Sequence, residues 1–386
     1  MTSLLKDTLT ERAESAEAPH LDLDGITRTG DQRIRRRRTV SALAVAAVTT
    51  AVVATGIGVW RSANHQDGEP APAAPAPAAF TERRATYATG DKIHYGQQII
   101  TVGANRVAAF VQTDVGFVYV DKAGDVFIAD GHRIDKVGSG NRTLRLKSSD
   151  TGSLVGWVDR SKSVPEFVVY DAAARREVVR TSEGNRPGKV TREWEPTVIG
   201  IDGGFAYLAA SDGLRKWDLS ADSGRLVKPG LRPDEVQDVA AGKLAFEHWP
   251  NGHDHEGGTA VSQDINAIQP PHFMGWVGDL SPGAKYLLTD KNDQQHLFRV
   301  NSPAEITLRH PNHPLIAINQ WVNDDEFFAV GFKDKEIKPR MQPIDLLHCS
   351  VTGRACSVVV AKFAQYPTDY KNPAFQLPGG RTFDDW

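Results

Sequence analysis

The chain has 386 residues, of which 40% are hydrophobic and 8% aromatic, and its formal net charge at pH 7 is −3. This length allows two or three domains or one large β architecture, and the near-neutral charge argues against a nucleic-acid partner. Two cysteines exclude a disulfide-dense scaffold, whereas 34 glycines and 22 prolines favour a domain rich in strands and turns.

Residues 1–38 are expected to form a cytoplasmic tail that is mostly disordered. Leucines at positions 4, 5 and 9 have helical spacing, which predicts a short amphipathic helix near the beginning. One interpretation is that the tail only orients the chain. The alternative is that a short motif, at residues 4–9 or 21–26, docks a cytoplasmic protein partner.

Residues 39–60 contain no ionisable side chain and would form a helix about 33 Å long, enough to cross a bilayer. Trp60 lies where an indole contacts the outer membrane interface, and the basic residues before the segment keep the N-terminus in the cytoplasm. We therefore predict a single-pass cell-membrane protein that contacts lipid and has its C-terminal domain outside. The orienting arginines are Arg35, Arg36, Arg37 and Arg38.

Two alternatives to a membrane anchor remain open. Arg37 and Arg38 before an alanine-rich run are compatible with a twin-arginine export signal, cleaved or uncleaved, because the segment is only modestly hydrophobic. A buried helix of a soluble core is the other. Between the anchor and the large domain, residues 61–80 form a linker whose alternating proline and alanine favour a polyproline II rod of about 30 Å.

Residues 81–386 show short strands rich in valine, phenylalanine, tyrosine and isoleucine, separated by turn residues. One strand–turn–strand hairpin recurs, and its copies can be aligned on single residues after the first strand. The intervals between these residues are 41, 47, 82 and 49, and because 82 is twice 41 we expect one degenerate copy near residues 259–268. The aligned residues are Asp130, Asp171, Asp218, Val300 and Cys349.

A period of about 40–45 residues with four short strands is typical of β-propeller blades. Two motifs here resemble WD40-like and TolB-like propellers: Trp217-Asp218, and the strand opening Ser281-Pro282-Gly283. The preceding tail and helix resemble those of actinobacterial single-pass proteins, some of which are encoded beside alternative sigma factors. The period and the resemblance together predict an all-β, six- or seven-bladed extracytoplasmic propeller. A two-sheet sandwich is the second choice of fold.

Six hairpins are recognised, the length allows seven blades, and we expect the strand at residues 97–102 to close the ring against the last blade. Tryptophans recur about once per blade, which predicts that they pack between blades. Cys349 and Cys356 flank a hairpin turn, where facing residues are close enough for a disulfide in an oxidising exterior.

The candidate metal ligands are His248, His253 and His255, in a glycine-rich loop whose spacing is poorly suited to a preorganised Zn or Ni site. An exposed polar turn is the alternative. No catalytic motif and no cofactor motif is recognised. We therefore expect a non-catalytic binding or sensing module for a protein or glycan ligand, with a link to envelope signalling. The alternatives are a scaffold of a wall-associated complex and a metal-dependent surface hydrolase or lyase.

Overall fold

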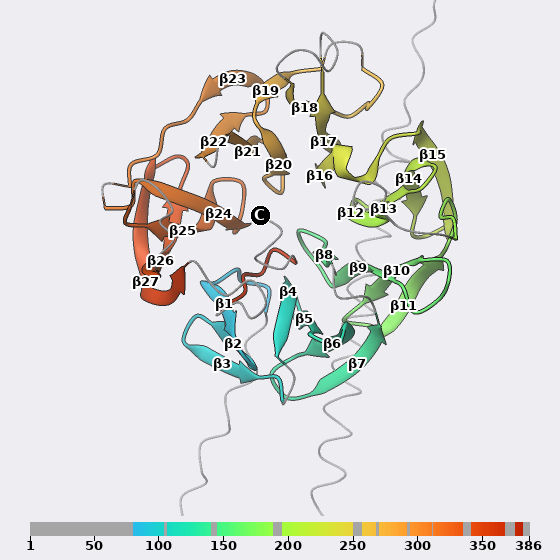
Figure 1. The fold of residues 1–386 in the computed structure, drawn as a ribbon, viewed down its shortest axis with the longest axis horizontal. Helices are drawn as coiled ribbons and strands as arrows, with labels where there is room; N and C mark the ends of the chain where they lie inside the picture. The colour runs from blue at the N-terminus through green and yellow to red at the C-terminus, as the bar shows by residue number, and fades with distance from the viewer. Residues whose placement is uncertain are drawn as a thin grey trace, which may run out of the picture. The chain divides into compact units, whose positions relative to one another are not determined.

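The computed structural model describes residues 80–103, 106–139, 145–187, 195–249, 257–267, 270–291, 294–310, 312–334, 341–366 and 375–380. They lie in the second of two compact units, residues 75–386, and form seven antiparallel sheets arranged around a central axis (Figure 1). The tail, the segment 39–60 with Trp60 and the orienting arginines, and residues 61–79 lie outside the described residues. Within the described residues, no helix has the length and apolar character needed to cross a membrane.

Blade 1 has three strands and the other six blades have four, joined in sequence order within each sheet. Blades 1 to 4 are β1 (Thr86–Thr89), β2 (Lys92–Tyr95), β3 (Gln98–Thr101); β4 (Val107–Thr113), β5 (Gly116–Asp121), β6 (Asp125–Ala129), β7 (Ile134–Ser139); β8 (Lys147–Ser148), β9 (Leu154–Asp159), β10 (Glu166–Asp171), β11 (Arg176–Thr181); β12 (Thr197–Asp202), β13 (Phe205–Ala210), β14 (Gly213–Asp218), β15 (Ser223–Pro229).

A short 3-10 helix, η2 (Pro233–Glu235), leads into blade 5. Blades 5 to 7 are β16 (Val236–Ala240), β17 (Lys243–His248), β18 (Gly258–Ser262), β19 (His272–Met274); β20 (Trp276–Leu280), β21 (Tyr286–Lys291), β22 (Gln294–Arg299), β23 (Ser302–Glu305); β24 (Leu315–Trp321), β25 (Glu326–Phe332), β26 (Gln342–Ser350), β27 (Ala355–Tyr366). The first strand of each four-stranded blade lies nearest the axis and the fourth lies at the rim (Figure 1).

The seven-bladed architecture confirms the propeller prediction. The six hairpins recognised by their repeat are the third and fourth strands of blades 2 to 7, and the degenerate copy expected near residues 259–268 is the beginning of the β18–β19 hairpin. Aspartates were a useful marker because they accept hydrogen bonds from the turn. Asp130, Asp171 and Asp218 each accept two, from the backbone N–H groups two and three residues later.

Ring closure differs from the prediction. The segment at 97–102 contains β3, the outermost strand of blade 1, on which Ile99 is 56% exposed. The fourth, innermost position of blade 1 is instead taken by the C-terminal segment, where Gln376 exchanges backbone hydrogen bonds of 2.8 and 2.9 Å with Ala88 of β1. Both ends of the described chain therefore contribute to one blade.

Buried apolar side chains among the described residues form seven clusters, one at each interface between neighbouring blades. Trp157, Trp217 and Trp321 belong to three of these clusters, so the predicted packing of tryptophans between blades is confirmed for them. Phe80, at the end of the predicted linker, is buried against Tyr95. Core formation between blades makes each blade depend on its neighbours for stability.

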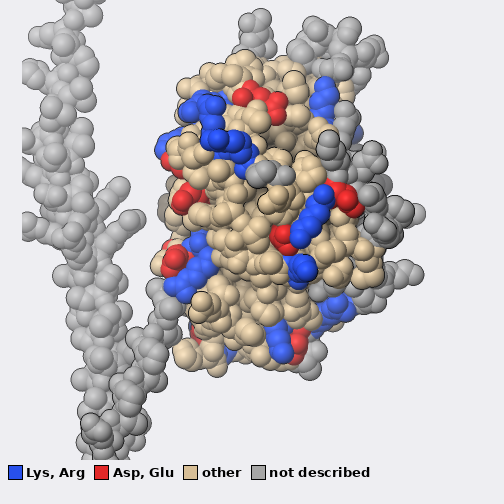
Figure 2. Space-filling view, turned by 90° about the vertical axis from the view of Figure 1, so that its left-hand side faces the viewer, with Lys and Arg blue, Asp and Glu red and all other residues tan. Residues whose placement is uncertain are grey.

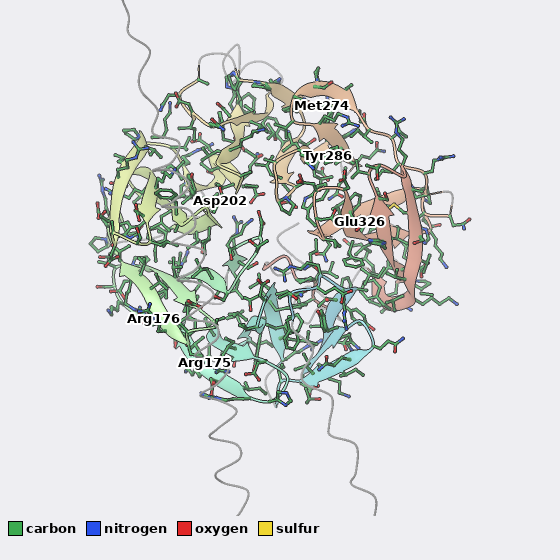
Figure 3. The ribbon with its side chains drawn as sticks, turned by 180° about the vertical axis from the view of Figure 1, so that it is seen from behind. Arg175, Arg176, Asp202, Met274, Tyr286 and Glu326 are labelled. Carbon is green, nitrogen blue, oxygen red and sulfur yellow. A yellow bond between two sulfur atoms is a disulfide. The ribbon has the colours of Figure 1, made fainter. Side chains whose placement is uncertain are left out.

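The rim is stabilised by polar contacts as well. Arg175 of blade 3 reaches back to blade 2, where it contacts Asp135 and lies 2.6 Å from Asp130. Figure 3 places Arg175 and Arg176 near the rim and Asp202 on the inner side of the ring. On the face shown in Figure 2, basic and acidic side chains lie beside one another instead of forming one large patch of a single sign.

Candidate functional site

A cavity of about 450 Å³ occupies the centre of the ring. The innermost strands of all seven blades line it, with the C-terminal segment taking that role for blade 1. Apolar residues such as Val111, Leu146 and Ile201 line the cavity together with polar and charged ones. A cavity of this size with a few converging polar groups has the properties of a small-molecule binding site.

The innermost strands share an irregularity that affects what they present to the cavity. Strand pairing shifts register within β4, β12, β16, β20 and β24, so each of them contains a β-bulge or similar break. Bulges redirect side chains and recur near functional sites. In β16 the shift falls at Gln237 and in β24 it falls at Asn319, and both residues border the cavity.

Gln237, at the bulge of β16, forms hydrogen bonds both within its own blade and to the next blade. Its side-chain oxygen accepts a hydrogen bond of 2.6 Å from the backbone N–H of Gly278 in the next blade, and another of 3.0 Å from the Thr259 hydroxyl. Gly278 has no side chain, and a Cβ there would lie 2.7 Å from the same oxygen. The glutamine therefore joins blades 5 and 6 at the cavity wall.

Asn319 occupies the corresponding place in blade 7, beside the seam where the ring closes. It is 6% exposed, and neither its amide nitrogen nor its amide oxygen has a hydrogen-bond partner or contact with solvent. The side-chain oxygens of Gln112 and Gln320, which also border the cavity, are buried without partners. Buried polar groups without partners destabilise a fold by about 1–3 kcal/mol each, so this part of the cavity wall is less stable than a fully hydrogen-bonded wall would be.

Several charged residues line the cavity near the turns that join the first and second strands of the blades. The Lys147 ammonium is 3.1 Å from one carboxylate oxygen of Asp238, and the other oxygen accepts a 2.9 Å hydrogen bond from the backbone N–H of Leu280. These contacts join blades 3, 5 and 6 around the cavity. Because the pair is largely buried, removing one partner would leave an uncompensated charge.

Asp150 follows β8 and also lines the cavity. Burial within the ring, and next the negative charge of Asp238, raise its pKa to about 7; Asp202 adds to this effect, and Lys147 and Arg83 oppose it. The residue nevertheless remains exposed to solvent, because it faces the open cavity instead of packed protein. A carboxyl group with this pKa changes its charge near neutral pH, which is typical of functional sites.

Three further aspartates connect the turns of neighbouring blades. Asp114, Asp202 and Asp324 accept hydrogen bonds of 2.8, 2.6 and 2.7 Å from backbone N–H groups in an adjacent blade. The donors belong to Gly152, Gly242 and Gly283, which lie 38, 40 and 41 residues away in the sequence. These aspartates fix the turns that surround one end of the cavity.

The predicted motif Ser281-Pro282-Gly283 is part of this arrangement. The Ser281 hydroxyl donates a 2.8 Å hydrogen bond to Asp324, which also receives the Gly283 N–H and lies 3.1 Å from Lys285. Burial opposes ionisation, but the bonds from Ser281, Gly283 and Lys285 hold the pKa of Asp324 below its usual value. Pro282 borders the cavity.

The other repeat motif lies away from the cavity. The Trp217 indole is buried and donates a 3.2 Å hydrogen bond to Asp222 across the β14–β15 turn. Its six-membered ring covers Gly224, where a Cβ would lie 2.2 Å from the ring, so any other residue would displace it. Asp218 stabilises the same turn. Both motif residues therefore have a structural role.

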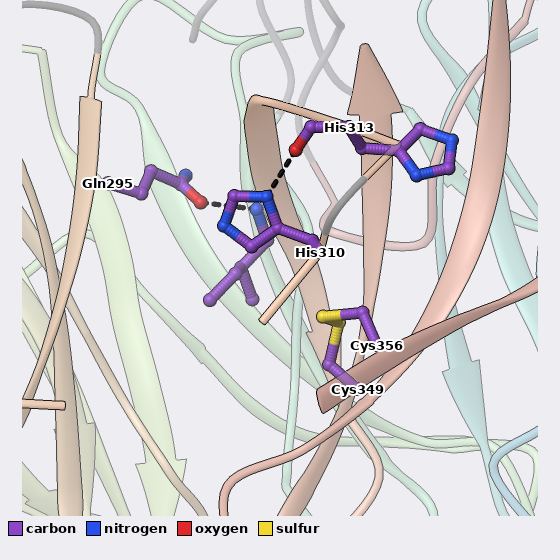
Figure 4. The surroundings of a disulfide bond; sticks show 6 residues. Gln295, His310, His313, Cys349 and Cys356 are labelled. Carbon is purple, nitrogen blue, oxygen red and sulfur yellow. Dashed lines mark hydrogen bonds between the residues drawn. A yellow bond between two sulfur atoms is a disulfide. The ribbon is translucent and has the colours of Figure 1, made fainter. Parts of the chain in front are cut away.

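Cys349 and Cys356 face each other across β26 and β27, with Cα atoms 4.0 Å apart, and they form a disulfide-compatible pair (Figure 4). In the same region, the buried His313 lies 2.9 Å from Asp345. Burial raises the pKa of Asp345, but the hydrogen bonds from His313 and the Lys362 N–H outweigh this effect and lower it. The histidine thereby anchors the chain entering blade 7 to β26.

The predicted metal ligands are only partly within the described residues. His248 ends β17 and its ring lies 5.8 Å from that of His272, a histidine that the sequence analysis did not select; His253 and His255 lie outside the described residues. Burial lowers the pKa of both rings, and for His272 the nearby His248 adds to the effect. Among the residues that the structure describes, no three His, Cys, Asp or Glu side chains are placed to hold a metal ion.

Apart from Pro282, the cavity residues were not predicted from the sequence, although one signal was available. Aspartates followed by a glycine about 40 residues later, as in Asp114–Gly152 and Asp202–Gly242, repeat the blade period and could have identified the turns that meet at the axis. Asp150 and Asn319 carry no such signal, because their positions become special only when the ring closes.

Together the sheets and the cavity define the chain as a seven-bladed β-propeller with a central cavity that is lined by apolar, polar and charged residues. No protein-family model matches the chain, and no curated protein matches it. The solved structures that are similar to it include Kluyveromyces lactis Hsv2, with 10% identity, a TM-score of 0.40, and coverage of 64% of this chain and 75% of that chain.

Two other similar structures can be added. A chain from the crystal structure of Mitotic Checkpoint Complex has 12% identity and a TM-score of 0.42, and covers 77% of this chain and 88% of its own. A chain from a structural and mechanistic analysis of two prolyl endopeptidases has 11% identity and a TM-score of 0.47, and covers 72% of this chain and 50% of its own. The particular propeller family, WD40-like or TolB-like, stays a hypothesis.

Proposed function

We propose that this protein is a membrane-anchored, non-catalytic binding or sensing module whose ligand engages the central cavity. The observation that carries the proposal is that the innermost strands of six blades and the C-terminal segment that completes blade 1 together line a cavity of about 450 Å³ with polar and charged groups on its wall. A ring of packed blades is a rigid frame for such a site, and rigidity lowers the entropic cost of binding.

The membrane part of the proposal rests on the sequence. Residues 39–60 supply the anchor, and the arginines at 35–38 place the tail in the cytoplasm and the propeller outside. The partners would then be membrane lipid, a protein or glycan ligand of the propeller, and a cytoplasmic protein bound by the tail. A role in envelope signalling follows from the resemblance of the tail and helix to single-pass proteins encoded beside sigma factors.

The cavity can be tested by partner capture with the full-length chain in its native membrane. Ser148→Trp would place an indole on β8 at the cavity wall, whereas Ser357→Trp places the same side chain on the exposed rim strand β27. Partners retained by the wild type and by Ser357→Trp but lost with Ser148→Trp would support the proposal. Partners retained by both variants would assign binding to the outer surface and refute the cavity as the site.

A scaffold role predicts that both tryptophan variants retain their partners, because a stable protein partner would then bind the rim. The metal-dependent hydrolase or lyase is kept as a candidate only because His272 adds a second ring to His248, at 5.8 Å. For this candidate we expect about one equivalent of bound Zn or Ni in the purified full-length chain, lost in His272→Ala. A metal content that is unchanged in His272→Ala would remove the pair from the candidate site.

A further inference from the structure

The charged groups that line the cavity include two basic side chains, Arg83 and Lys147, and the carboxylates of Asp150 and Asp238. Both basic groups already have protein partners. Lys147 pairs with Asp238, and the guanidinium of Arg83 donates a 3.1 Å hydrogen bond to the backbone oxygen of Asp150 and lies 3.6 Å from Asp114.

The carboxylate of Asp150 differs from that of Asp238. Asp238 is only 8% exposed and both of its oxygens are engaged, by Lys147 and by the Leu280 N–H. Asp150 is open to the cavity, and its side chain accepts no hydrogen bond from any residue that the structure describes. The buried side-chain oxygens of Gln112 and Gln320 also lack donors. Of the carboxylates of Asp150 and Asp238, only that of Asp150 is therefore open to a ligand in the cavity.

The size and the remaining lining favour an organic ligand over a bare ion. The cavity volume of about 450 Å³ is within the range of pockets that enclose small organic molecules. Val111, Leu146, Ile201 and Leu280 provide apolar surface beside the charged groups. A short carbon chain can contact these residues while a charged end group reaches a carboxylate.

We propose that the central cavity binds a small organic cation whose ammonium group pairs with the Asp150 carboxylate. This inference rests on the proposed binding function and specifies its ligand class. A cation would pair with the Asp150 carboxylate, because the neighbouring basic groups of Lys147 and Arg83 are already engaged by other protein groups. A charge-assisted hydrogen bond is stronger than one between neutral groups.

Binding should release a proton. Asp150 has a pKa of about 7, so near neutral pH about half of the molecules carry a protonated carboxyl that must transfer its proton to solvent before pairing with the ammonium. The groups that act on this equilibrium are Asp238 and Asp202, which favour protonation, and Lys147 and Arg83, which oppose it. Affinity should therefore be about tenfold higher at pH 8 than at pH 6.

The test uses three probes with the same four-carbon chain: 1,4-diaminobutane, 1,4-butanediol and succinate. Titration calorimetry of the full-length chain at pH 6 and pH 8, in buffers of different ionisation enthalpy, measures affinity and proton release together. Like the lysine side chain, the amino groups of the diamine stay protonated over this range, so the pH dependence reports on the protein. We expect binding of the diamine only, tighter at pH 8 and accompanied by proton release.

Asp150→Asn removes the charge but keeps the size of the side chain. It should weaken diamine binding at pH 8 by about tenfold or more and abolish the pH dependence. Asp264→Asn is the matched control, because Asp264 is exposed and outside the cavity lining, and asparagine can keep the hydrogen bond that its oxygen accepts from the Asn266 N–H. Thermal unfolding of both variants verifies that they are folded.

The outcomes separate this inference from the proposed function. Binding of the diol or of succinate in preference to the diamine would overturn the cationic ligand and leave the cavity as a binding site. Diamine binding that is unchanged in Asp150→Asn would also overturn it. If no probe binds, the inference fails, and the Ser148→Trp capture experiment still decides whether the cavity binds a partner.

Discussion

Replacing Asn319 by leucine should stabilise the protein. The residue lies at the bulge of β24, is 6% exposed, and has two amide atoms without partners or solvent contact. Leucine has the same branch point and needs no hydrogen bond. Relief of the unsatisfied groups is worth about 1–3 kcal/mol in the free energy of unfolding, and for a domain of about 300 residues 2 kcal/mol raises Tm by about 3 °C.

Thermal unfolding of Asn319→Leu against the wild type measures this effect. The matched control is Asn323→Leu, four residues later, where the amide donates a 2.9 Å hydrogen bond to Glu326 and accepts one of 2.8 Å from the Asp325 N–H. The control should lower Tm. A lower Tm in Asn319→Leu as well would mean that the amide is satisfied in the native protein, and would refute its assignment as an unpaired group in the cavity wall.

Three other changes follow from the same contacts. Replacing both Cys349 and Cys356 by serine should destabilise an oxidised sample by about 2.5 kcal/mol in the chain-entropy estimate for a separation of 7 residues, whereas an equal Tm under reducing and oxidising conditions would indicate that no bond forms. Asp324→Ala removes the acceptor of Ser281 and Gly283 and should cost about 1.5–3 kcal/mol. A smaller loss is expected in Asp324→Asn, whose amide oxygen can still accept these bonds but lacks the charge beside Lys285. Asp150→Asn should raise Tm at pH 8 but not at pH 4. The pKa of Asp150 is higher in the folded state than in the unfolded state, so the wild type loses stability as pH rises from about 4 to 7, whereas the asparagine variant does not. A difference in Tm that does not depend on pH would contradict this.

The propeller was predictable because its signals are local. Each third strand ends at a tight turn, and aspartate accepts the N–H groups of such a turn, so Asp130, Asp171 and Asp218 marked the repeat. The degenerate copy in blade 5 was found by its interval alone, since β19 begins only at His272, after a longer connection. Local turn chemistry and period together therefore identified six of the seven blades.

The closure of the ring and the residues that line the central cavity could not be predicted from local signals. Ile99 and its neighbours have the composition of a strand, but nothing local says whether a strand lies at the axis or at the rim. Gln376, which does close the ring, lies in a short segment without a strand-like pattern and pairs with a residue at the other end of the domain. The unpaired amide of Asn319 and the raised pKa of Asp150 both result from this assembly of distant strands.

The shared first blade has a consequence for biosynthesis. A ribosome makes β1 first and the segment at 375–377 last, so the earliest strands must wait with an open edge until nearly the whole domain has been made. During that interval the edge of β1 can pair with the final segment of another molecule, which would exchange ends between two chains. If the propeller is exported, chaperones outside the membrane would have to protect this edge, and removal of residues 375–386 should leave the edge of β1 permanently open and yield aggregated chains.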